Sequence, residues 1–182
     1  MALGASALVM AARPLAARGR LLEPSLTLSL TTGSDRVVAL TLDACSGGFD
    51  RRVAEALIAW SVPATLFLTA RWIASNPEGL SLIRDNAGLF AIGNHGAAHI
   101  APVLGATAVY GVKAAGDLKS IRAEVQGGAE AIRRATGVTP KWYRGATALY
   151  SPEAIPVIEQ EGFALAGFSL NGDDGASLAA AA

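Results

Sequence analysis

The chain alternates between short apolar runs and segments whose apolar residues recur every three or four positions. The short runs are typical of buried strands, and the longer repeat is typical of helices that place one face on a core. Strands are predicted at residues 36–42, 64–69, 88–93, 142–144 and 163–170. Helices are predicted at residues 50–60, 76–86, 117–136 and 151–161, with a long loop at 97–116. This alternation implies an α/β fold with a mostly parallel sheet, open or rolled into a barrel.

Capping residues support several of these helix boundaries. Asp50 directly precedes a helical pattern formed by Val53, Leu57 and Trp60, so we interpret Asp50 as an N-cap. Ser151 followed by Pro152 is predicted to cap the last helix, and Gly137 is predicted to end the long one. The apolar stripe of that long helix is predicted to be Ile121, Val125, Ala129 and Ile132.

Composition favours one globular domain with no polyanionic partner. The 182 residues are 52% hydrophobic, and 15 basic and 15 acidic residues are interspersed to a formal net charge of zero. Without a basic patch we expect no nucleic-acid partner, and a neutral sugar polymer or small amide suits this surface better. The single Cys45 rules out an internal disulfide, and we expect it to pack as a buried residue near a strand end.

The first 35 residues are predicted to lie outside the domain. Residues 1–17 are rich in alanine and resemble a signal peptide without its start, with an ordinary helix as the alternative. Their apolar stretch is too short to span a bilayer, so no stable membrane span is predicted. We therefore predict an extracytoplasmic location, periplasmic or secreted, with the cytoplasm as the alternative. Residues 18–35 are interpreted as a linker or leading strand, and residues 36–182 as the domain.

Both histidines of the chain, His95 and His99, stand four residues apart just after an apolar run. Residues at this spacing lie on one face of a helical turn, so both imidazoles can reach one metal ion. Two polar residues in a surface turn are the alternative interpretation, because the spacing alone names no third ligand.

Asp43 ends another apolar run and is followed by a glycine-rich turn. In sheets flanked by helices, side chains at the carboxyl ends of strands leave the packed core and face a crevice. We therefore assign a function to Asp43, in contrast to the capping role of Asp50.

Three motifs in this order resemble those of the polysaccharide deacetylase family, the NodB-like carbohydrate esterases. They are a strand that ends in Thr41-Leu42-Asp43, the His95 and His99 pair after a later strand, and Lys141-Trp142-Tyr143-Arg144-Gly145. The resemblance covers roughly residues 36–178. It implies a distorted (β/α) barrel of the NodB type.

The resemblance also implies roles for four residues. Asp43 corresponds to the catalytic base and Arg144 to the arginine that orients it, while His95 and His99 correspond to the metal-binding pair. The implied cofactor is a divalent metal, first of all zinc, with cobalt or nickel as alternatives. The implied partner is an N-acetylated polysaccharide or oligosaccharide, peptidoglycan or chitin-like, from which water activated by the metal removes acetyl groups.

Two features of the family pattern are missing from the chain, and a third is matched only weakly. Ala44 stands where the family has the aspartate that is its third metal ligand, so that Asp43, Asn94 or a water would complete the coordination. A fourth motif is matched only weakly by the segment with Asp173 and Asp174, which could instead form a structural salt bridge with the arginine. A fifth motif, a histidine that acts as general acid, has no counterpart, and we expect the barrel to be incomplete at its carboxyl end.

These departures keep two further functions open beside deacetylation. The missing aspartate also suits a related hydrolase of small amides or imides. The absence of both the general-acid histidine and the third metal ligand favours a non-catalytic carbohydrate-binding remnant. For the chain as it stands we expect weak activity or none.

Overall fold

The computed structural model describes residues 20–26 and 37–172. The predicted signal peptide, most of the predicted linker, and Asp173 and Asp174 lie outside the described residues. Within the predicted linker, Leu22 contacts the domain. The backbones of Leu22 and Tyr150 exchange two hydrogen bonds, of 2.8 and 2.9 Å, in an isolated antiparallel bridge.

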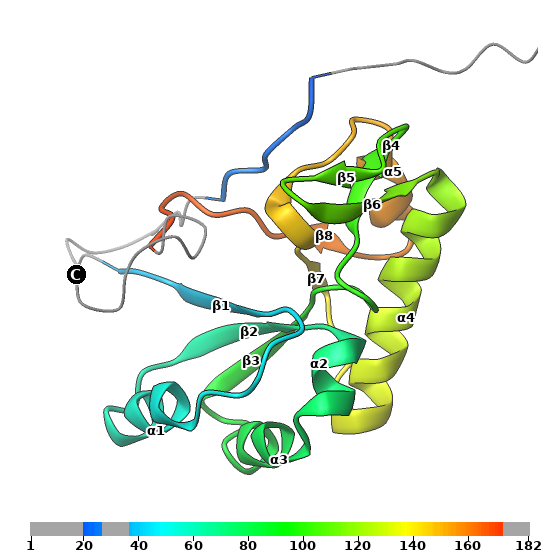
Figure 1. Cartoon of the computed structure of the whole chain (residues 1–182). Helices are drawn as coiled ribbons and strands as arrows, with labels where there is room; N and C mark the ends of the chain where they lie inside the picture. The colour runs from blue at the N-terminus through cyan, green and yellow to red at the C-terminus, as the bar shows by residue number, and fades with distance from the viewer. Residues whose placement is uncertain (1–19, 27–36, 173–182) are drawn as a thin grey trace, which may run out of the picture.

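A parallel sheet forms the centre of the fold, in the strand order β1-β2-β3-β7-β8 (Figure 1). Its strands are β1 (Leu40–Ala44), β2 (Ala64–Leu68), β3 (Phe90–Asn94), β7 (Trp142–Tyr143) and β8 (Ala164–Leu165). In the register, Ala44 pairs with Leu68, and Leu68 pairs with Asn94. The first three strands therefore end at the same level, and the residues that follow them meet at one edge.

Helices pack against this sheet because each has one apolar face. They are α1 (Arg51–Ala59), α2 (Ala70–Ser75), α3 (Pro77–Asp85), α4 (Leu118–Thr136) and α5 (Ala154–Gln160), with a single 3-10 turn η1 (Ala146–Ala148). One core lies between β1–β3 and the helices α2–α4, and a second lies between α4, α5 and β7. None of these helices in the described part of the chain is long and apolar enough to cross a membrane.

Side chains alternate along β1, and this alternation separates packing from chemistry. Leu40 and Ala44 pack against the first core, whereas Thr41 and Asp43 both bond to Arg144 on the opposite face of the sheet. Successive side chains on a strand point to opposite faces, so the polar positions of this strand share one face.

Several predicted boundaries are confirmed. Asp50 is the N-cap of α1, and its carboxylate accepts a 3.0 Å hydrogen bond from the backbone N–H of Arg52. Gly137 ends α4 in the left-handed conformation, with a φ of 75°. Ile121, Val125 and Ile132 of the predicted stripe are buried. The prediction of an α/β fold with a mostly parallel sheet is confirmed as well.

The predicted long loop at residues 97–116 is wrong. This segment contains β4 (Ala101–Leu104), β5 (Ala108–Val109) and β6 (Val112–Gly116), which form a small sheet in the order β4-β6-β5. These strands have two to five residues each, too few for an alternating pattern to stand out. The small sheet has its own core of Ala101, Val103 and Ala114.

Three further boundaries differ from the prediction. Helix α2 was not predicted; its N-cap is Thr69, whose hydroxyl accepts a 2.9 Å hydrogen bond from the backbone N–H of Trp72. Ser151 does not cap α5, because its hydroxyl accepts a 2.9 Å hydrogen bond from Leu104 instead. The last predicted strand is much shorter, since only Ala164 and Leu165 pair with β7.

The strand that carries Asp43 is less buried than its apolar sequence predicted. Among the described residues β1 is an outer strand of the sheet, with β2 on one side. Val38, just before it, is 85% exposed. The sequence pattern reports hydrophobicity, whereas burial depends on what packs against both sides of the strand.

Candidate metal and catalytic site

Asp43 and Arg144 form an ion pair at the carboxyl end of the sheet. The Arg144 Nη1 donates a 2.9 Å hydrogen bond to Asp43 Oδ1, and the same nitrogen lies 2.9 Å from the Thr41 hydroxyl. The Asp43 side chain is 34% exposed, whereas that of Arg144 is almost fully buried. The carboxylate therefore faces solvent on one side while the guanidinium fixes its other side.

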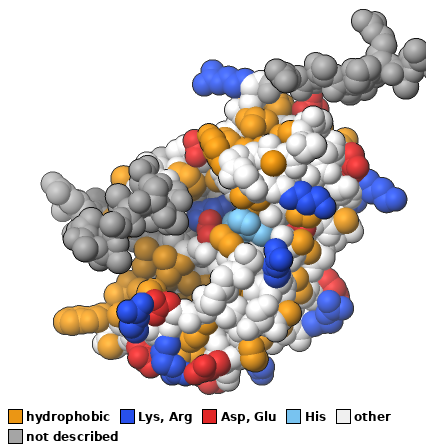
Figure 2. Space-filling view, viewed as in Figure 1, with side chains coloured by type: hydrophobic (Ala, Val, Ile, Leu, Met, Phe, Trp, Pro, Cys, Tyr) orange, Lys and Arg blue, Asp and Glu red, His pale blue; other side chains and the backbone are white. Residues whose placement is uncertain are grey.

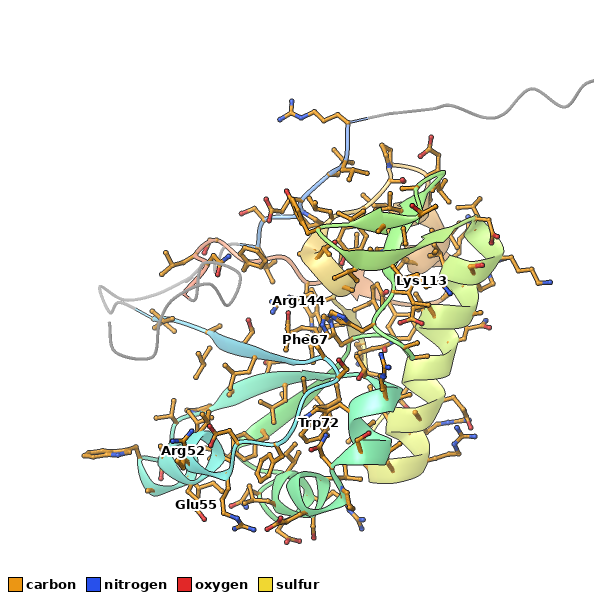
Figure 3. The ribbon with its side chains drawn as sticks, in the orientation of Figure 1. Arg52, Glu55, Phe67, Trp72, Lys113 and Arg144 are labelled. Carbon is orange, nitrogen blue, oxygen red and sulfur yellow. The ribbon has the colours of Figure 1, made fainter. Side chains whose placement is uncertain are left out.

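Arg144 is held by more than this ion pair. Its Nε donates to the Ala166 carbonyl and its Nη2 to the Gly167 carbonyl, both at 3.1 Å. The guanidinium carbon lies 4.3 Å from the centre of the Phe67 ring, an arrangement that favours a cation–π interaction (Figure 3). Gly93 makes room for this ring, since a Cβ there would lie 2.4 Å from it. The planar guanidinium of Arg144, with its N–H donors, is therefore held in one orientation.

His95 follows β3 directly and is oriented by the backbone of Arg144. Its Nδ1 lies 2.6 Å from the Arg144 carbonyl oxygen, which can only accept, so Nδ1 carries the proton. The other nitrogen, Nε2, then presents a lone pair and lies 4.0 Å from Asp43 Oδ2. Burial lowers the pKa of His95, which keeps the ring neutral near pH 7. A carbonyl that holds one histidine nitrogen is a common support for a metal ligand.

His99 lies in a loop, so the predicted shared helical turn is wrong. Its φ of 60° is in the left-handed region, and residues 95–100 contain no helix. The two rings nevertheless converge, with centroids 5.0 Å apart. Burial, followed by the neighbouring His95, lowers the pKa of His99. The pair therefore converges because of a loop held by other residues.

Glu124 of α4 holds that loop from both sides of His99. Its carboxylate accepts hydrogen bonds of 2.9–3.1 Å from the backbone N–H groups of Ala98 and Ile100. The Glu124 residue is only 5% exposed, and burial raises its pKa against the effect of these N–H donors. Glu124 was not predicted, because the apolar stripe of α4 marks it only as a charged residue inside a helix.

Gly128 lets the same loop approach α4 closely. A Cβ at this position would lie 2.2 Å from Asn94 Oδ1 and 2.5 Å from the Gly96 carbonyl carbon. Asn94 itself is fully buried, donates to the Val125 carbonyl at 2.8 Å, and accepts from the Gly96 N–H at 2.9 Å. A glycine in a helix interior usually costs stability, so this one marks a contact that excludes a side chain.

Replacing Gly128 with alanine is therefore expected to destabilise the protein, although alanine is the better helix former. Overpacking of this kind costs about 1–3 kcal/mol, more than the gain of about 1 kcal/mol from helix propensity. Urea unfolding followed by circular dichroism measures the change. Gly127→Ala is the comparison at the preceding position, because its added Cβ would meet only the Ala97 Cβ, at 3.0 Å, so we expect a smaller loss of stability. Equal stability of the two variants would contradict this role of Gly128.

Cys45 joins the two histidines in a cluster of metal-ligating atoms. Its Sγ lies 3.4 Å from His95 Nε2, and the ligand atoms of Cys45, His95 and His99 all lie within 4.8 Å of one another. Cys45 is only half-buried, so the expectation that it packs as a buried residue is wrong. It lies in the loop after the strand end, where apolar neighbours cover only part of it.

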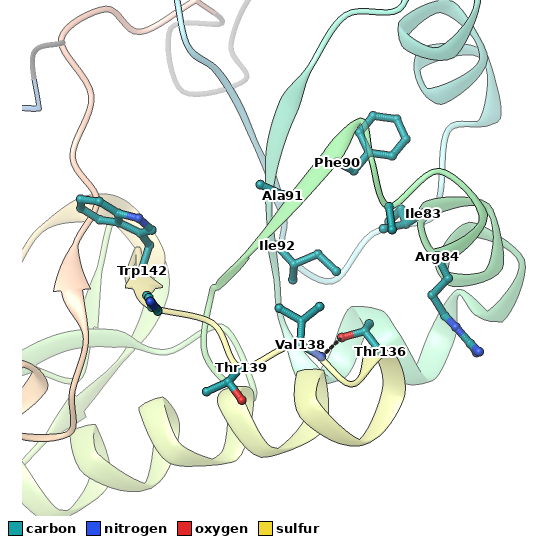
Figure 4. A pocket seen from close by; sticks show the side chains of 11 residues that line it. Ile83, Arg84, Phe90, Ala91, Ile92, Thr136, Val138, Thr139 and Trp142 are labelled. Carbon is teal, nitrogen blue, oxygen red and sulfur yellow. Dashed lines mark hydrogen bonds between the residues drawn. The ribbon is translucent and has the colours of Figure 1, made fainter. Parts of the chain in front are cut away.

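Two cavities among the described residues share Ile83 and Phe90 in their lining. One of about 340 Å³ is lined by the strand end that carries Asp43 and Cys45 and continues between α1 and the sheet. Figure 2 shows pale-blue histidine atoms at the surface beside a red acidic side chain, with blue basic side chains around them. The other, of about 510 Å³, lies where β3 begins, between Ile83, Val138 and Trp142 (Figure 4). Arg84 and Lys141 are the charged residues that line the second cavity, and His95, His99 and Arg144 line neither cavity.

Comparison with known proteins decides the family. The family model for polysaccharide deacetylases matches residues 31–166, which is most of the chain. The chain belongs to the polysaccharide deacetylase family. This membership agrees with the resemblance inferred from the Asp43, His95–His99 and Arg144 motifs. A comparison with curated proteins gave no significant match.

Solved structures show the same fold. A family 4 carbohydrate esterase from Streptomyces lividans in complex with acetate has a TM-score of 0.60 and 20% identity, with 78% of this chain and 67% of that chain covered. A family 4 carbohydrate esterase from Bacillus anthracis has a TM-score of 0.54 and 24% identity, with 70% and 57% covered. A pseudoenzyme of the CE4 family from Bacillus anthracis has a TM-score of 0.53 and 19% identity, with 72% and 43% covered. The chain thus spans little more than half of the Bacillus anthracis esterase.

Proposed function

We propose that this polysaccharide deacetylase domain binds a divalent metal ion through His95 and His99 and removes N-acetyl groups from a polysaccharide, with Asp43 as general base. The arrangement of Asp43 carries this proposal. Its Oδ1 is held by Arg144 at 2.9 Å, while its Oδ2 faces the metal-binding side of His95 at 4.0 Å. A carboxylate oxygen in this position can take a proton from a water beside the histidines.

The donor set fits the metal that the family implies. Burial lowers the pKa of both rings, which favours the neutral imidazole, the form that ligates zinc. A bound divalent ion would polarise the acetamide carbonyl and lower the pKa of a bound water. We propose zinc first, with cobalt or nickel as alternatives.

The protein's own groups account for the proton transfers. As the water oxygen attacks the carbonyl carbon, Asp43 Oδ2 accepts the water proton. When the carbon–nitrogen bond breaks, the protonated Asp43 returns this proton to the departing amine, so that a free amine and acetic acid result, and the acid then ionises to acetate. Arg144 takes no part in proton transfer, because arginine stays protonated in proteins; it keeps the carboxylate in place. Asp43 thus serves as base and then as acid.

Peptidoglycan or a chitin-like polymer is the proposed substrate, and it supports an extracytoplasmic location. Ala44 in place of the family's aspartate supports a second candidate, a domain that binds glycan without hydrolysing it. The fold similarity to a CE4 pseudoenzyme supports the same candidate. The two candidates differ in turnover and not in glycan binding.

The test measures metal content and acetate release on one preparation of the full chain. We expect about one zinc ion per chain, weak acetate release from a chitin oligosaccharide, loss of this release on chelation, and recovery when zinc is returned. His99→Ala is expected to lose both the ion and the release. Glycan binding without acetate release, in protein loaded with zinc, would instead favour the non-catalytic candidate.

A further inference from the structure

We propose that the thiolate of Cys45 is the third protein ligand of the metal, in place of the carboxylate that Ala44 cannot supply. The inference rests on the metal binding in the proposed function, and it adds a preference among divalent metals. A centre of two imidazoles and one thiolate would prefer zinc or cobalt over magnesium or manganese, which favour oxygen ligands.

Distances between the donor atoms support this assignment. Metal bonds of about 2.0–2.3 Å in a tetrahedral site place donor atoms about 3.3–3.8 Å apart. Cys45 Sγ and His95 Nε2 are already 3.4 Å apart, and all three donors lie within 4.8 Å of one another. A small rotation of the His99 or Cys45 side chain therefore suffices to close the site.

The backbone around Cys45 is fixed from the neighbouring strand. Thr69, fully buried at the end of β2, donates from its hydroxyl to the Cys45 carbonyl and from its N–H to the Ala44 carbonyl at 3.2 Å. The same Thr69 caps α2. The loop after β1 is thus tied to β2, just as the His95 side chain is tied to the chain after β7. Ligands supported in this way are placed before an ion arrives.

The other candidates for a third ligand have different tasks in the structure. Asn94 uses both ends of its amide on backbone groups, the Val125 carbonyl and the Gly96 N–H, and is fully buried. Asp43 gives one oxygen to Arg144, and its other oxygen is the one the proposed function requires as base. The thiol of Cys45 lies beside the histidine nitrogens and leaves both of those arrangements intact.

Ligation has a chemical consequence that can be measured. Binding converts the Cys45 thiol to a thiolate, with the proton released to solvent, and forms a metal–sulfur bond. A thiolate bound to cobalt(II) gives an intense charge-transfer absorption in the near ultraviolet, which imidazole and carboxylate ligands do not give. A metal-bound thiolate also reacts more slowly with alkylating reagents. Since Cys45 is the single cysteine of the chain, both signals report on it alone.

The experiment compares the wild type with Cys45→Ala and Cys45→Asp by cobalt(II) titration and by competition for zinc. We expect the charge-transfer band in the wild type only. Loss of a residue that only orients a metal ligand lowers metal affinity about 10–100-fold. Cys45→Ala removes a ligand itself, so we expect it to lose at least about a hundredfold in zinc affinity. Cys45→Asp should recover metal binding without the band. Should Cys45→Ala fold poorly, zinc protection of wild-type Cys45 from iodoacetamide, lost in His99→Ala, tests the same bond.

The outcomes separate this inference from the proposed function. Equal cobalt affinity in wild type and Cys45→Ala, with no band in either, would overturn the thiolate ligand and leave the metal-dependent deacetylase standing. Wild type that binds no metal would overturn both. Acetate release that survives chelation but requires Cys45 would replace both with a Cys45–His95 nucleophile pair.

Discussion

Asp43→Asn is expected to lower the rate of acetate release about 10²–10⁴-fold while the metal stays bound. The amide has the same shape and can still accept the hydrogen bond from Arg144 Nη1, but it cannot take a proton from water. The three clustered donors of Cys45, His95 and His99 are unchanged. Metal analysis and acetate release on the same sample measure the two effects separately.

Asp50→Asn is the matched control for that variant. Asp50 caps α1 outside the donor cluster, and asparagine is an equally good N-cap, so rate and metal content should both stay at the wild-type level. A loss of metal in Asp43→Asn would make Asp43 a ligand. A rate within about tenfold of wild type would contradict its role as base.

Arg144→Met is expected to lower the free energy of unfolding by about 2–6 kcal/mol, because two buried carbonyl acceptors lose their donor at about 1–3 kcal/mol each. The change leaves the carbonyls of Ala166 and Gly167 without their buried donor and leaves Asp43 without its partner. It also removes the guanidinium from the Phe67 ring. Urea unfolding at constant metal concentration measures the loss, and acetate release should fall with it.

Arg122→Met provides the comparison for that variant. Arg122 pairs with Glu161 on the surface of α4, with its side chain 45% exposed. Exposed pairs contribute about 0–1 kcal/mol, so this variant should unfold almost as the wild type does. Similar losses in the two variants would mean that the bonds of Arg144 add little. Arg144→Lys should lie near Arg144→Met, because an ammonium cannot reproduce the planar fork.

The candidate site shows where prediction from sequence succeeds and where it stops. Asp43 and Arg144 were predicted as a pair from family motifs about a hundred residues apart, and the structure places them 2.9 Å apart. The His95–His99 pair was predicted to share a helical turn, yet it converges through a loop. Glu124 and Gly128, which hold that loop, were not predicted, because nothing in their local pattern names the segment they contact.

Cys45 was misjudged for a related reason. A lone cysteine near a strand end was expected to be a buried packing residue, whereas the loop after β1 presents its thiol to His95. The distance between two residues fifty positions apart depends on how β1 and β3 are paired with β2. Sequence spacing carries no such distance.

The sequence by itself determined the alternation of strands and helices, the caps at Asp50 and Gly137, and the family motifs. These features depend on periodicity, local hydrogen bonds and residue chemistry, which are all written in neighbouring positions. Only the tertiary structure decided the short strands of the β4–β6 sheet, the exposure of β1, and the gathering of Cys45, His95 and His99. Those depend on contacts between distant segments, and it is the packing of β2 and α4 against the loops that brings them together.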